Sequence, residues 1–425
     1  MARTQVAGPP RARAISGATV AYALSLVPIV AGVGLTGVLT ANSGAEAPQS
    51  VFARLSNFDG RAYCDIAAFG YAPPARSGAL SNLAFFPAFP VLGRALALCL
   101  WLPAEAALVI VAHLCCWGAV VAGGAYARAR CPDSADAPSL TAMALALLPT
   151  TFFFRMAYSE SMFAVLTGTI LLGFHRRWPT VVLALLVGLA TATRFVGLAL
   201  VPPLLLYCWH SGRRSEIAGC SLHSAGEARR RVAACLAGFV LYASIACWGL
   251  LAFSAFQWIR FGDPLIFAKV QYDWGTLGEE PAPLIRRIVA TATLEPIWGT
   301  YVPSNPAYWA RFEPHGNPLF SLQFANPIYF VGTVLLIVFG WRKGLLNRYE
   351  LLTAAGLLLI PYVTKSYDNA MAGFGRFAAV VVPAYLVMGW LLARMPPVVR
   401  YSLLGVAGFF LGIYSAMFAA GYRFI

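Results

Sequence analysis

The sequence predicts an all-α protein that crosses a membrane many times. Of its 425 residues, 59% are hydrophobic and only 11% are charged, whereas an average soluble domain carries roughly 25% charged residues. The apolar residues also form blocks close to the ~20 residues that a helix needs to cross the hydrocarbon core. The blocks are unbroken, while a membrane barrel would show strands of alternating polarity. A bundle of transmembrane helices accounts for both observations.

About eleven spans satisfy the distribution of Arg and Lys, because short cytoplasmic loops carry the excess of basic residues. The spans are drawn as 14–40, 105–127, 139–156, 160–174, 178–193, 195–210, 232–258, 322–341, 350–364, 376–394 and 398–422. All basic clusters then fall on one side, namely Arg3/Arg11/Arg13, Arg128/Arg130, Arg176/Arg177, Arg213/Arg214 with Arg229/Arg230/Arg231, Arg342/Lys343/Arg348 and Arg394/Arg400.

This drawing depends on three choices. The first is that 84–102 lies along the outer membrane surface. The second is that 178–210 forms two short helices broken near Arg194. The third is that the first apolar block is a helix of the protein and not a cleaved signal, since it runs for about 25 residues and a signal core spans only about 7–15.

The chain then forms a single membrane domain, 1–425, with two long connections on the outer side, 41–104 and 259–321. The segment 209–231 is a basic, solvated cytoplasmic loop. Long loops on a rigid scaffold are where binding and catalytic residues concentrate. The two outer connections, and the long first one above all, are therefore the places to search for function.

Composition argues against two other classes of function. The net charge is +14, but the basic residues are scattered over loops and form no stripe with exposed aromatics, so no nucleic-acid partner is expected. The nine Cys show no CxxC spacing and the five His show no helical metal-binding pattern. We expect neither a metal site nor a disulfide framework.

Two carboxylates stand in the first outer connection, which reads NFDGRAYCDIAAFGY over 57–71. They are Asp59 and Asp65. A carboxylate at the membrane surface, beside groups that exclude water, can serve as a general base. The alternative is that Asp59 caps a helix or is a solvated loop acid.

Charged residues also interrupt apolar segments. Arg155 and Glu160 stand in TFFFRMAYSESMF (151–163), and Arg194 stands in ATATRFVGLAL (190–200). A charge inside an apolar segment costs about 2.5–3.5 kcal/mol or more and normally faces a cavity or a partner. These residues are therefore either functional or members of a structural ion pair, such as Glu160 with Arg194.

Further polar candidates lie on the same predicted side of the membrane. The segment VTKSYDNAMAGFGRFAAV (363–380) adds Lys365, Asp368 and Arg376. The second outer connection contains QWIRFGDPLIFAKVQYDWG (257–275), with Gln271 beside aromatic residues. Amide and aromatic groups suit contacts to sugars or polyprenols, and they suit an interfacial belt equally well.

These motifs together resemble the PIG-V family, the GPI mannosyltransferase II type and its prokaryotic relatives, within the GT-C class of membrane glycosyltransferases. The similar pieces run in family order across about 320 residues: Asp59, DIAxxGY (65–71), AFFPxxP (84–90), AYSESMF (157–163), ATRxxG (192–197), FGDPxxF with a following Gln and Trp (261–274), and GRF (375–377). One departure is Phe58, where the family usually has Trp.

The resemblance implies an inverting transfer of mannose from polyprenyl-phosphate-mannose, with Asp59 as the catalytic base. A phosphate leaving group needs no second carboxyl as acid, but it needs a cation. Arg194 and Arg376 are the first candidates and Lys365 a weaker one, with Glu160 orienting an arginine or a sugar hydroxyl. Gln271 and Asp65 complete the expected donor site, with no metal and no cofactor besides the lipid-linked donor.

Two alternatives remain open. Another polyprenyl-phosphate sugar could replace mannose, or the chain could be a transporter or flippase. The acceptor is expected to be a glycolipid, either GPI-like or a lipoglycan, or a protein. The location is a bacterial plasma membrane, or the endoplasmic reticulum membrane in a eukaryote, with membrane lipids around the chain.

Overall fold

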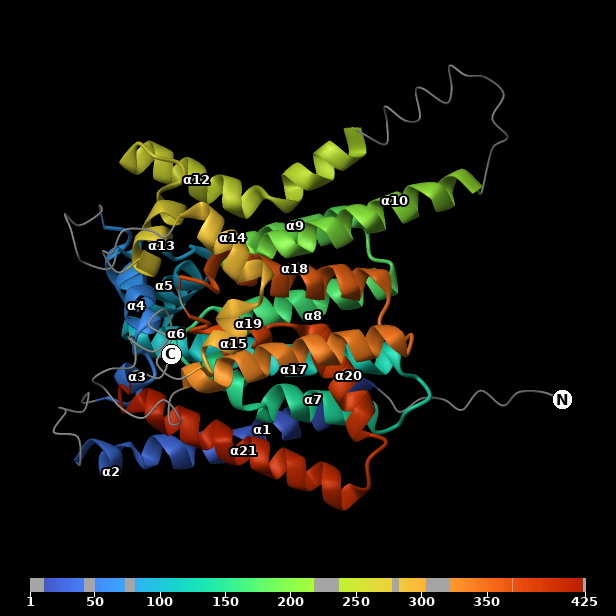
Figure 1. Ribbon diagram of the computed structural model, residues 1–425, viewed down its shortest axis with the longest axis horizontal. Helices are drawn as coiled ribbons and strands as arrows, with labels where there is room; N and C mark the ends of the chain where they lie inside the picture. Colours follow the sequence, from blue (N-terminus) through green and yellow to red (C-terminus); the bar gives the residue numbers. More distant parts are fainter. Residues whose placement is uncertain are drawn as a thin grey trace.

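The computed structural model describes residues 11–41, 50–72, 81–217, 237–276, 283–302, 322–368 and 370–422, and the regular structure in these ranges is helical throughout. Figure 1 shows the arrangement. The elements are α1 (Arg11–Gly34), α2 (Thr36–Ala41), α3 (Val51–Arg54), α4 (Asp59–Phe69), η1 (Asn82–Ala84), α5 (Ala88–Leu100), α6 (Ala104–Arg130), α7 (Ala137–Leu147), η2 (Pro149–Arg155), α8 (Glu160–Arg176), α9 (Thr180–Thr193), η3 (Phe195–Leu200), α10 (Val201–Ile217), a helix over Ala237–Ala246, α12 (Trp248–Phe261), α13 (Ile266–Thr276), α14 (Leu284–Ala292), α15 (Glu295–Gly299), α17 (Leu322–Arg342), α18 (Arg348–Lys365), α19 (Phe374–Ala379), α20 (Val382–Leu392) and α21 (Pro397–Ala419).

Several helices are long and apolar enough to cross a membrane. Within the described ranges they number four, and up to six if each of two bent helix pairs is one span. The four are Gly17–Val38, Ala104–Arg130, Phe324–Arg342 and Pro397–Ala419. The chain is thus a multi-pass membrane protein. The count of eleven spans is not confirmed, because the other apolar helices, such as α9 and α20, are shorter.

Helix breaks divide several of the predicted spans. The predicted break in 178–210 is confirmed, because α9 ends at Thr193 and η3 begins at Phe195. The span 139–156 is instead the pair α7 and η2, bent by 74°. Leu148 has ψ 133° because it precedes Pro149, which disfavours the helical conformation.

Two more breaks were not expected. The span 232–258 consists, where described, of Ala237–Ala246 and α12, bent by 63°. The span 376–394 is divided into α19 and α20, and Pro383 lies in the first turn of α20. Proline favours a helix start at such a position. A continuous apolar run therefore does not guarantee a continuous helix.

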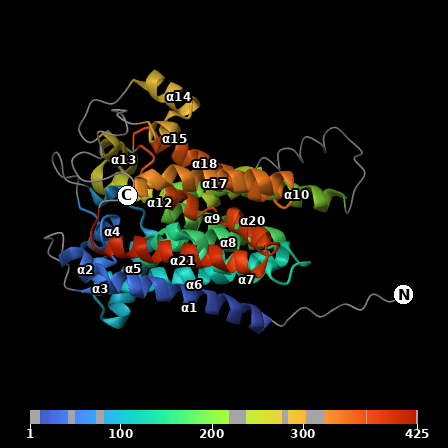
Figure 2. The same ribbon diagram turned by 60° about the horizontal axis from the view of Figure 1, so that its bottom comes forward.

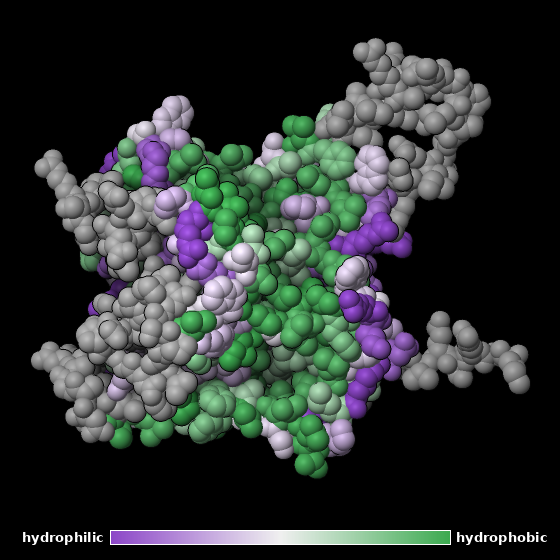
Figure 3. All heavy atoms as spheres, viewed as in Figure 1, coloured by the Kyte–Doolittle hydropathy of each residue, from purple (hydrophilic) through white to green (hydrophobic). Residues whose placement is uncertain are grey.

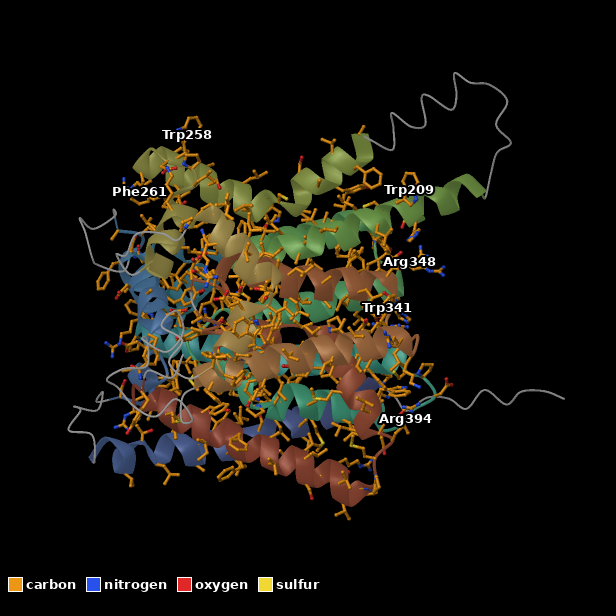
Figure 4. All side chains as sticks on the ribbon, in the orientation of Figure 1. Trp209, Trp258, Phe261, Trp341, Arg348 and Arg394 are labelled. Atoms are coloured by element: carbon orange, nitrogen blue, oxygen red, sulfur yellow. The ribbon has the colours of Figure 1, made fainter. Side chains whose placement is uncertain are left out.

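The long helices lie side by side, and the two ends of the bundle differ. The helices α3, α4 and α5 of the first outer connection and α13 of the second gather at one end in two views (Figures 1 and 2). Arg348 and Arg394, which belong to predicted cytoplasmic clusters, lie at the opposite end (Figure 4). Between the ends, the visible face carries a broad apolar band (Figure 3). This is the pattern expected of a bundle whose middle faces lipid.

Both outer connections are folded into short helices. The first contains α3, α4, η1 and α5, and α5 packs on α6. With 13 residues, α5 would extend about 20 Å at 1.5 Å per residue, too short for the ~30 Å of hydrocarbon. The second connection contains α13, α14 and α15, where the sequence predicts only a loop. Its parts 277–282 and 303–321 lie outside the described residues.

Candidate functional site

A pocket lies where the first outer connection meets the breaks between helices. Its volume is about 690 Å³, including the open space at its mouth. It is lined by Asp59, Tyr63, Ala84, Phe85, Phe86, Tyr158, Glu160, Thr193, Arg194, Phe195, Val196, Gln271, Ile360, Pro361, Thr364, Lys365, Arg376 and Phe377. Six of the seven residues expected at the site from the sequence therefore line one cavity.

Asp59 is the first residue of α4. A carboxylate in the first turn of a helix interacts favourably with the positive end of the helix dipole. The Asp59 Oδ2 atom lies 2.5 Å from a terminal nitrogen of Arg376, and the Asp59 side chain is one-third exposed. The second carboxylate oxygen, Oδ1, makes no hydrogen bond within the described part of the chain. Asp59 is thus neither a helix cap nor a free loop acid.

Glu160 joins the two arginines of the pocket. Its Oε1 atom lies 2.5 Å from a terminal nitrogen of Arg194 and 3.0 Å from Nε of Arg376. The Glu160 side chain is fully buried, so without these partners its charge would be severely destabilising. The pair of Glu160 with Arg194 that the sequence allowed is therefore present, and it lines the same pocket as the functional candidates.

Arg194 reaches the pocket because the helix breaks at this residue. Its backbone is extended, with φ −155° and ψ 144°. After the break the chain folds back on α9, and a Cβ atom at Gly197 would lie 2.6 Å from the carbonyl carbon of Ala190. Only glycine allows so close an approach. The Arg194 guanidinium also donates to the Ser159 hydroxyl at 3.3 Å.

Lys365 is the last residue of α18 and follows the predicted span 350–364. Among the described residues it makes no hydrogen bond and no ion pair, and its Nζ atom lies 5.9 Å from the centre of the Phe377 ring. Burial, and then the nearby charges of Arg376 and Arg194, lower the pKa of Lys365 to about 8. Within the described ranges, this lysine is therefore the cation of the pocket that lacks a direct ion-pair partner.

The pocket therefore has an excess of positive charge. Its lining contains two carboxylates against three cations, and the carboxylates are paired with the arginines. The Phe377 ring lies 5.9 Å from the guanidinium of Arg194 and 5.7 Å from that of Arg376. An aromatic face stabilises nearby cations. The arrangement suits an anionic ligand such as a phosphate.

The remaining predicted residues are divided. Gln271 lines the pocket, and its amide donates to the Ala84 carbonyl at 3.2 Å, which ties the second outer connection to the first. Asp65 is exposed on α4 and does not line the pocket. Six residues turn a helix by about 600°, so Asp59 and Asp65 lie on different faces.

Two other charged candidates also lie away from the pocket. Arg155 is fully buried and donates to Ser25 Oγ at 2.6 Å and to the Ala146 carbonyl at 2.9 Å. It thus satisfies a carbonyl at the end of α7. Asp368 forms an ion pair with Arg287. The side chains of Tyr272 and Trp274 lie outside the described residues.

Several pocket residues were missed in the sequence. Tyr158 lines the pocket, and its neighbour Ser159 bonds to two lining residues. Both belong to the motif AYSESMF, in which only the glutamate had drawn attention. The Tyr63 hydroxyl lies 2.8 Å from Ser159 Oγ. Burial raises the pKa of Tyr63 to about 12, so this phenol remains protonated. The sequence did contain a signal for these residues, because Tyr158 stands close to the charged Glu160 within one motif.

No three His, Cys, Asp or Glu side chains come together as metal ligands would, within the ranges that the structure describes. The expectation that no metal takes part stays a prediction.

The chain matches no protein-family model and no curated protein. It is similar to solved structures of the oligosaccharyltransferase of Archaeoglobus fulgidus. One, tethered to an acceptor peptide, matches 94% of this chain at 15% identity with a TM-score of 0.44. Another, in complex with an inhibitory peptide and a dolichol-phosphate, matches 94% at 14% identity with a TM-score of 0.45. The chain spans 55% and 56% of the length of those proteins. Similarity of this extent assigns neither a family nor an activity.

Proposed function

We propose that this chain is a membrane glycosyltransferase that transfers a sugar from a polyprenyl-phosphate donor. The resemblance of its motifs favours mannose as that sugar. The observation that supports it most is the pocket itself, which holds a carboxylate at its edge and an unpaired cation, Lys365, within one cavity. In this proposal the pocket opens on the non-cytoplasmic side, opposite the basic clusters that the sequence assigns to the cytoplasm. No cofactor besides the donor takes part.

Charge decides how the donor binds. Arg194 and Arg376 are already neutralised in part by Glu160 and Asp59, so the excess positive charge is that of Lys365. Lys365 binds the donor phosphate first, which reverses the order expected from the sequence, where the arginines came first. The apolar lining of Phe195, Val196 and Ile360 accommodates the lipid beside the phosphate.

The paired state of Asp59 has a consequence for catalysis. The Oδ2 atom of Asp59 is occupied by the Arg376 guanidinium, so it is not free to accept the proton of an acceptor hydroxyl while the pair is closed. In the proposed reaction the donor phosphate competes for Arg376 and releases Asp59. Glu160 keeps both guanidiniums within reach of the phosphate throughout, so their positions are not lost when the pair opens.

The transfer is then a single displacement. The acceptor hydroxyl oxygen forms a bond to the anomeric carbon while the bond from that carbon to the phosphate oxygen breaks. The hydroxyl proton passes to Asp59, and the polyprenyl phosphate leaves with the electron pair. Cations beside the phosphate stabilise the charge that develops on it. The product has inverted configuration, and the acceptor is a glycolipid or a protein.

The test is transfer of radiolabel in membranes that contain the chain. Labelled polyprenyl-phosphate-mannose is supplied beside the corresponding glucose and arabinose donors, and the labelled product is identified. We expect one donor to label a glycolipid or protein in wild-type membranes and not in membranes with Asp59→Ala. Asp136→Asn is the control, because Asp136 pairs with Arg400 outside the pocket at 2.7 Å.

Transfer from none of the donors would contradict the proposal. Translocation of a lipid or solute without any glycosyl transfer would favour a transporter instead. Transfer of glucose or arabinose alone would keep the reaction and correct the sugar.

A further inference from the structure

The turn that precedes Asp59 has an unusual backbone. Phe58 has φ 56° and ψ −121°, and the Gly60 N–H donates to the Asn57 carbonyl at 3.1 Å. These are the features of a type II′ turn, whose first central residue has φ of about +60° and ψ of about −120° and is normally glycine. A phenylalanine in this region is strained, and such strain persists only where the surroundings impose it.

Tyr158 provides much of that restraint. Its hydroxyl accepts a hydrogen bond from the Asp59 N–H at 3.2 Å and donates one to the Asn57 carbonyl at 3.3 Å. The two hydrogen bonds hold the backbone of the turn at the residues before and after Phe58. The Tyr158 side chain is 1% exposed, and burial raises the pKa of its phenol well above the usual value, so the hydroxyl keeps its proton.

The C-terminal helix adds to the restraint. The Phe58 ring packs edge-on against Phe418 of α21, with ring centres 5.5 Å apart. Phe418 also packs on the Tyr158 ring at 5.6 Å. The Asn57 side-chain amide donates to the Phe418 carbonyl at 2.9 Å. The turn is therefore held between two elements that are distant from it in the sequence.

Tyr158 also contacts the partner of the candidate base. The guanidinium of Arg376 lies 5.5 Å from the centre of the Tyr158 ring. One side chain thus touches the backbone of Asp59 through its hydroxyl and the arginine that pairs with Asp59 through its ring. No other residue with described contacts joins these two.

We propose that Tyr158 is a positioning residue, which clamps the strained turn at Phe58 and so fixes the carboxylate of Asp59 relative to Arg376. This inference rests on the proposed function. Its central prediction is that the effects of substitutions at positions 158 and 58 depend on each other. If the clamp works against backbone strain, removal of the strain must compensate for loss of the clamp.

The test is a double-mutant cycle with two readouts. Tyr158→Phe removes only the hydroxyl, and we expect kcat for glycosyl transfer to fall at least tenfold with little change in donor KM. Phe58→Gly in that background should restore several-fold of the lost kcat, since glycine adopts this backbone without strain. Phe58→Ala is the matched control, because it removes the same ring but keeps the Cβ atom, and it should restore nothing.

The second readout is the melting temperature of the same purified variants, which requires no enzymatic activity. The loss caused by Tyr158→Phe should be smaller in the Phe58→Gly background than in the Phe58→Ala background. Tyr207→Phe is the control for loss of a buried hydroxyl, since Tyr207 donates to the Trp178 carbonyl at 2.8 Å and does not line the pocket.

The outcomes separate the two proposals. If the wild type transfers sugar and Tyr158→Phe keeps full kcat, or glycine and alanine at position 58 behave alike, the clamp is wrong and the proposed function stands. If the wild type transfers no sugar, the proposed function is wrong, and the melting temperatures alone decide whether Tyr158 clamps the turn.

Discussion

Removal of the Lys365 charge tests how the pocket binds its donor. Lys365→Met keeps an unbranched side chain of similar length and removes the unpaired cation. A unit charge about 4 Å from a phosphate charge gains roughly 4 kcal/mol at an effective dielectric constant near 20. After the cost of desolvation, a hydrogen bond between charged groups contributes about 1.5–3 kcal/mol.

Each 1.4 kcal/mol corresponds to about a tenfold change in affinity. We therefore expect Lys365→Met to raise the KM for the donor roughly 10- to 100-fold, with a smaller effect on kcat, because the attraction is present before the reaction begins. The assay is steady-state transfer at varied donor concentration. Lys269→Met is the matched control, since Lys269 is exposed and pairs with Asp263 outside the pocket at 2.5 Å.

The same residue predicts the pH dependence. With a pKa of about 8, Lys365 is charged below that pH and neutral above it, so donor KM should rise as the pH passes through 8. Lys365→Arg should stay charged and keep a low KM at pH 9. The effect of Lys365 on folding stability goes the other way, because stability increases with pH where donor binding weakens. In the unfolded chain Lys365 keeps its proton up to its ordinary pKa of 10.5. The free energy of unfolding therefore rises between pH 8 and pH 10.5. A donor KM that is unchanged in Lys365→Met, or that still rises through pH 8 in this variant, would refute this reasoning.

Three further predictions concern the surroundings of the pocket. Glu160→Gln leaves two partly buried guanidiniums without their shared carboxylate and should cost up to about 3–5 kcal/mol of stability, measured by unfolding in detergent. An unchanged melting temperature would show that the bridge is unimportant. Asp65→Asn should leave transfer within about twofold of wild type, since a side chain outside the pocket contributes little, and a large loss would restore Asp65 to the donor site that the sequence predicted. Cysteines can be introduced separately at positions 65 and 348 in a background without reactive thiols. An impermeant maleimide should label them from opposite sides of sealed vesicles. Labelling of both positions from the same side would contradict the topology.

The sequence was most informative where a charged residue interrupts an apolar segment. Arg194 was a functional candidate because a charge inside an apolar segment is costly, and the break near it was predicted because it keeps the basic clusters on one side. Glu160 was found as such an exception, whereas Asp59 was found as a carboxylate in the first outer connection. These residues carry their signal locally, so one sequence was enough to find them.

The features that sequence reasoning missed depend on distant contacts. The ion pairs of the three cations could not be read from their spacing, because they depend on which carboxylate each cation meets in the fold. Tyr158 acts through a hydroxyl bonded to a turn 99 positions earlier. The bend at Leu148 did have a local signal in Pro149, and α14 had one in the helical spacing of its apolar residues.

The central claim is most directly tested by measuring donor binding and transfer together in Asp59→Asn. Transfer should fall about 10²- to 10⁴-fold, the usual contribution of a general base. Donor affinity should be kept or should increase, because Arg376 is no longer held by a carboxylate. Transfer at the wild-type rate in this variant would contradict the account, since Asp59 could not then be the base.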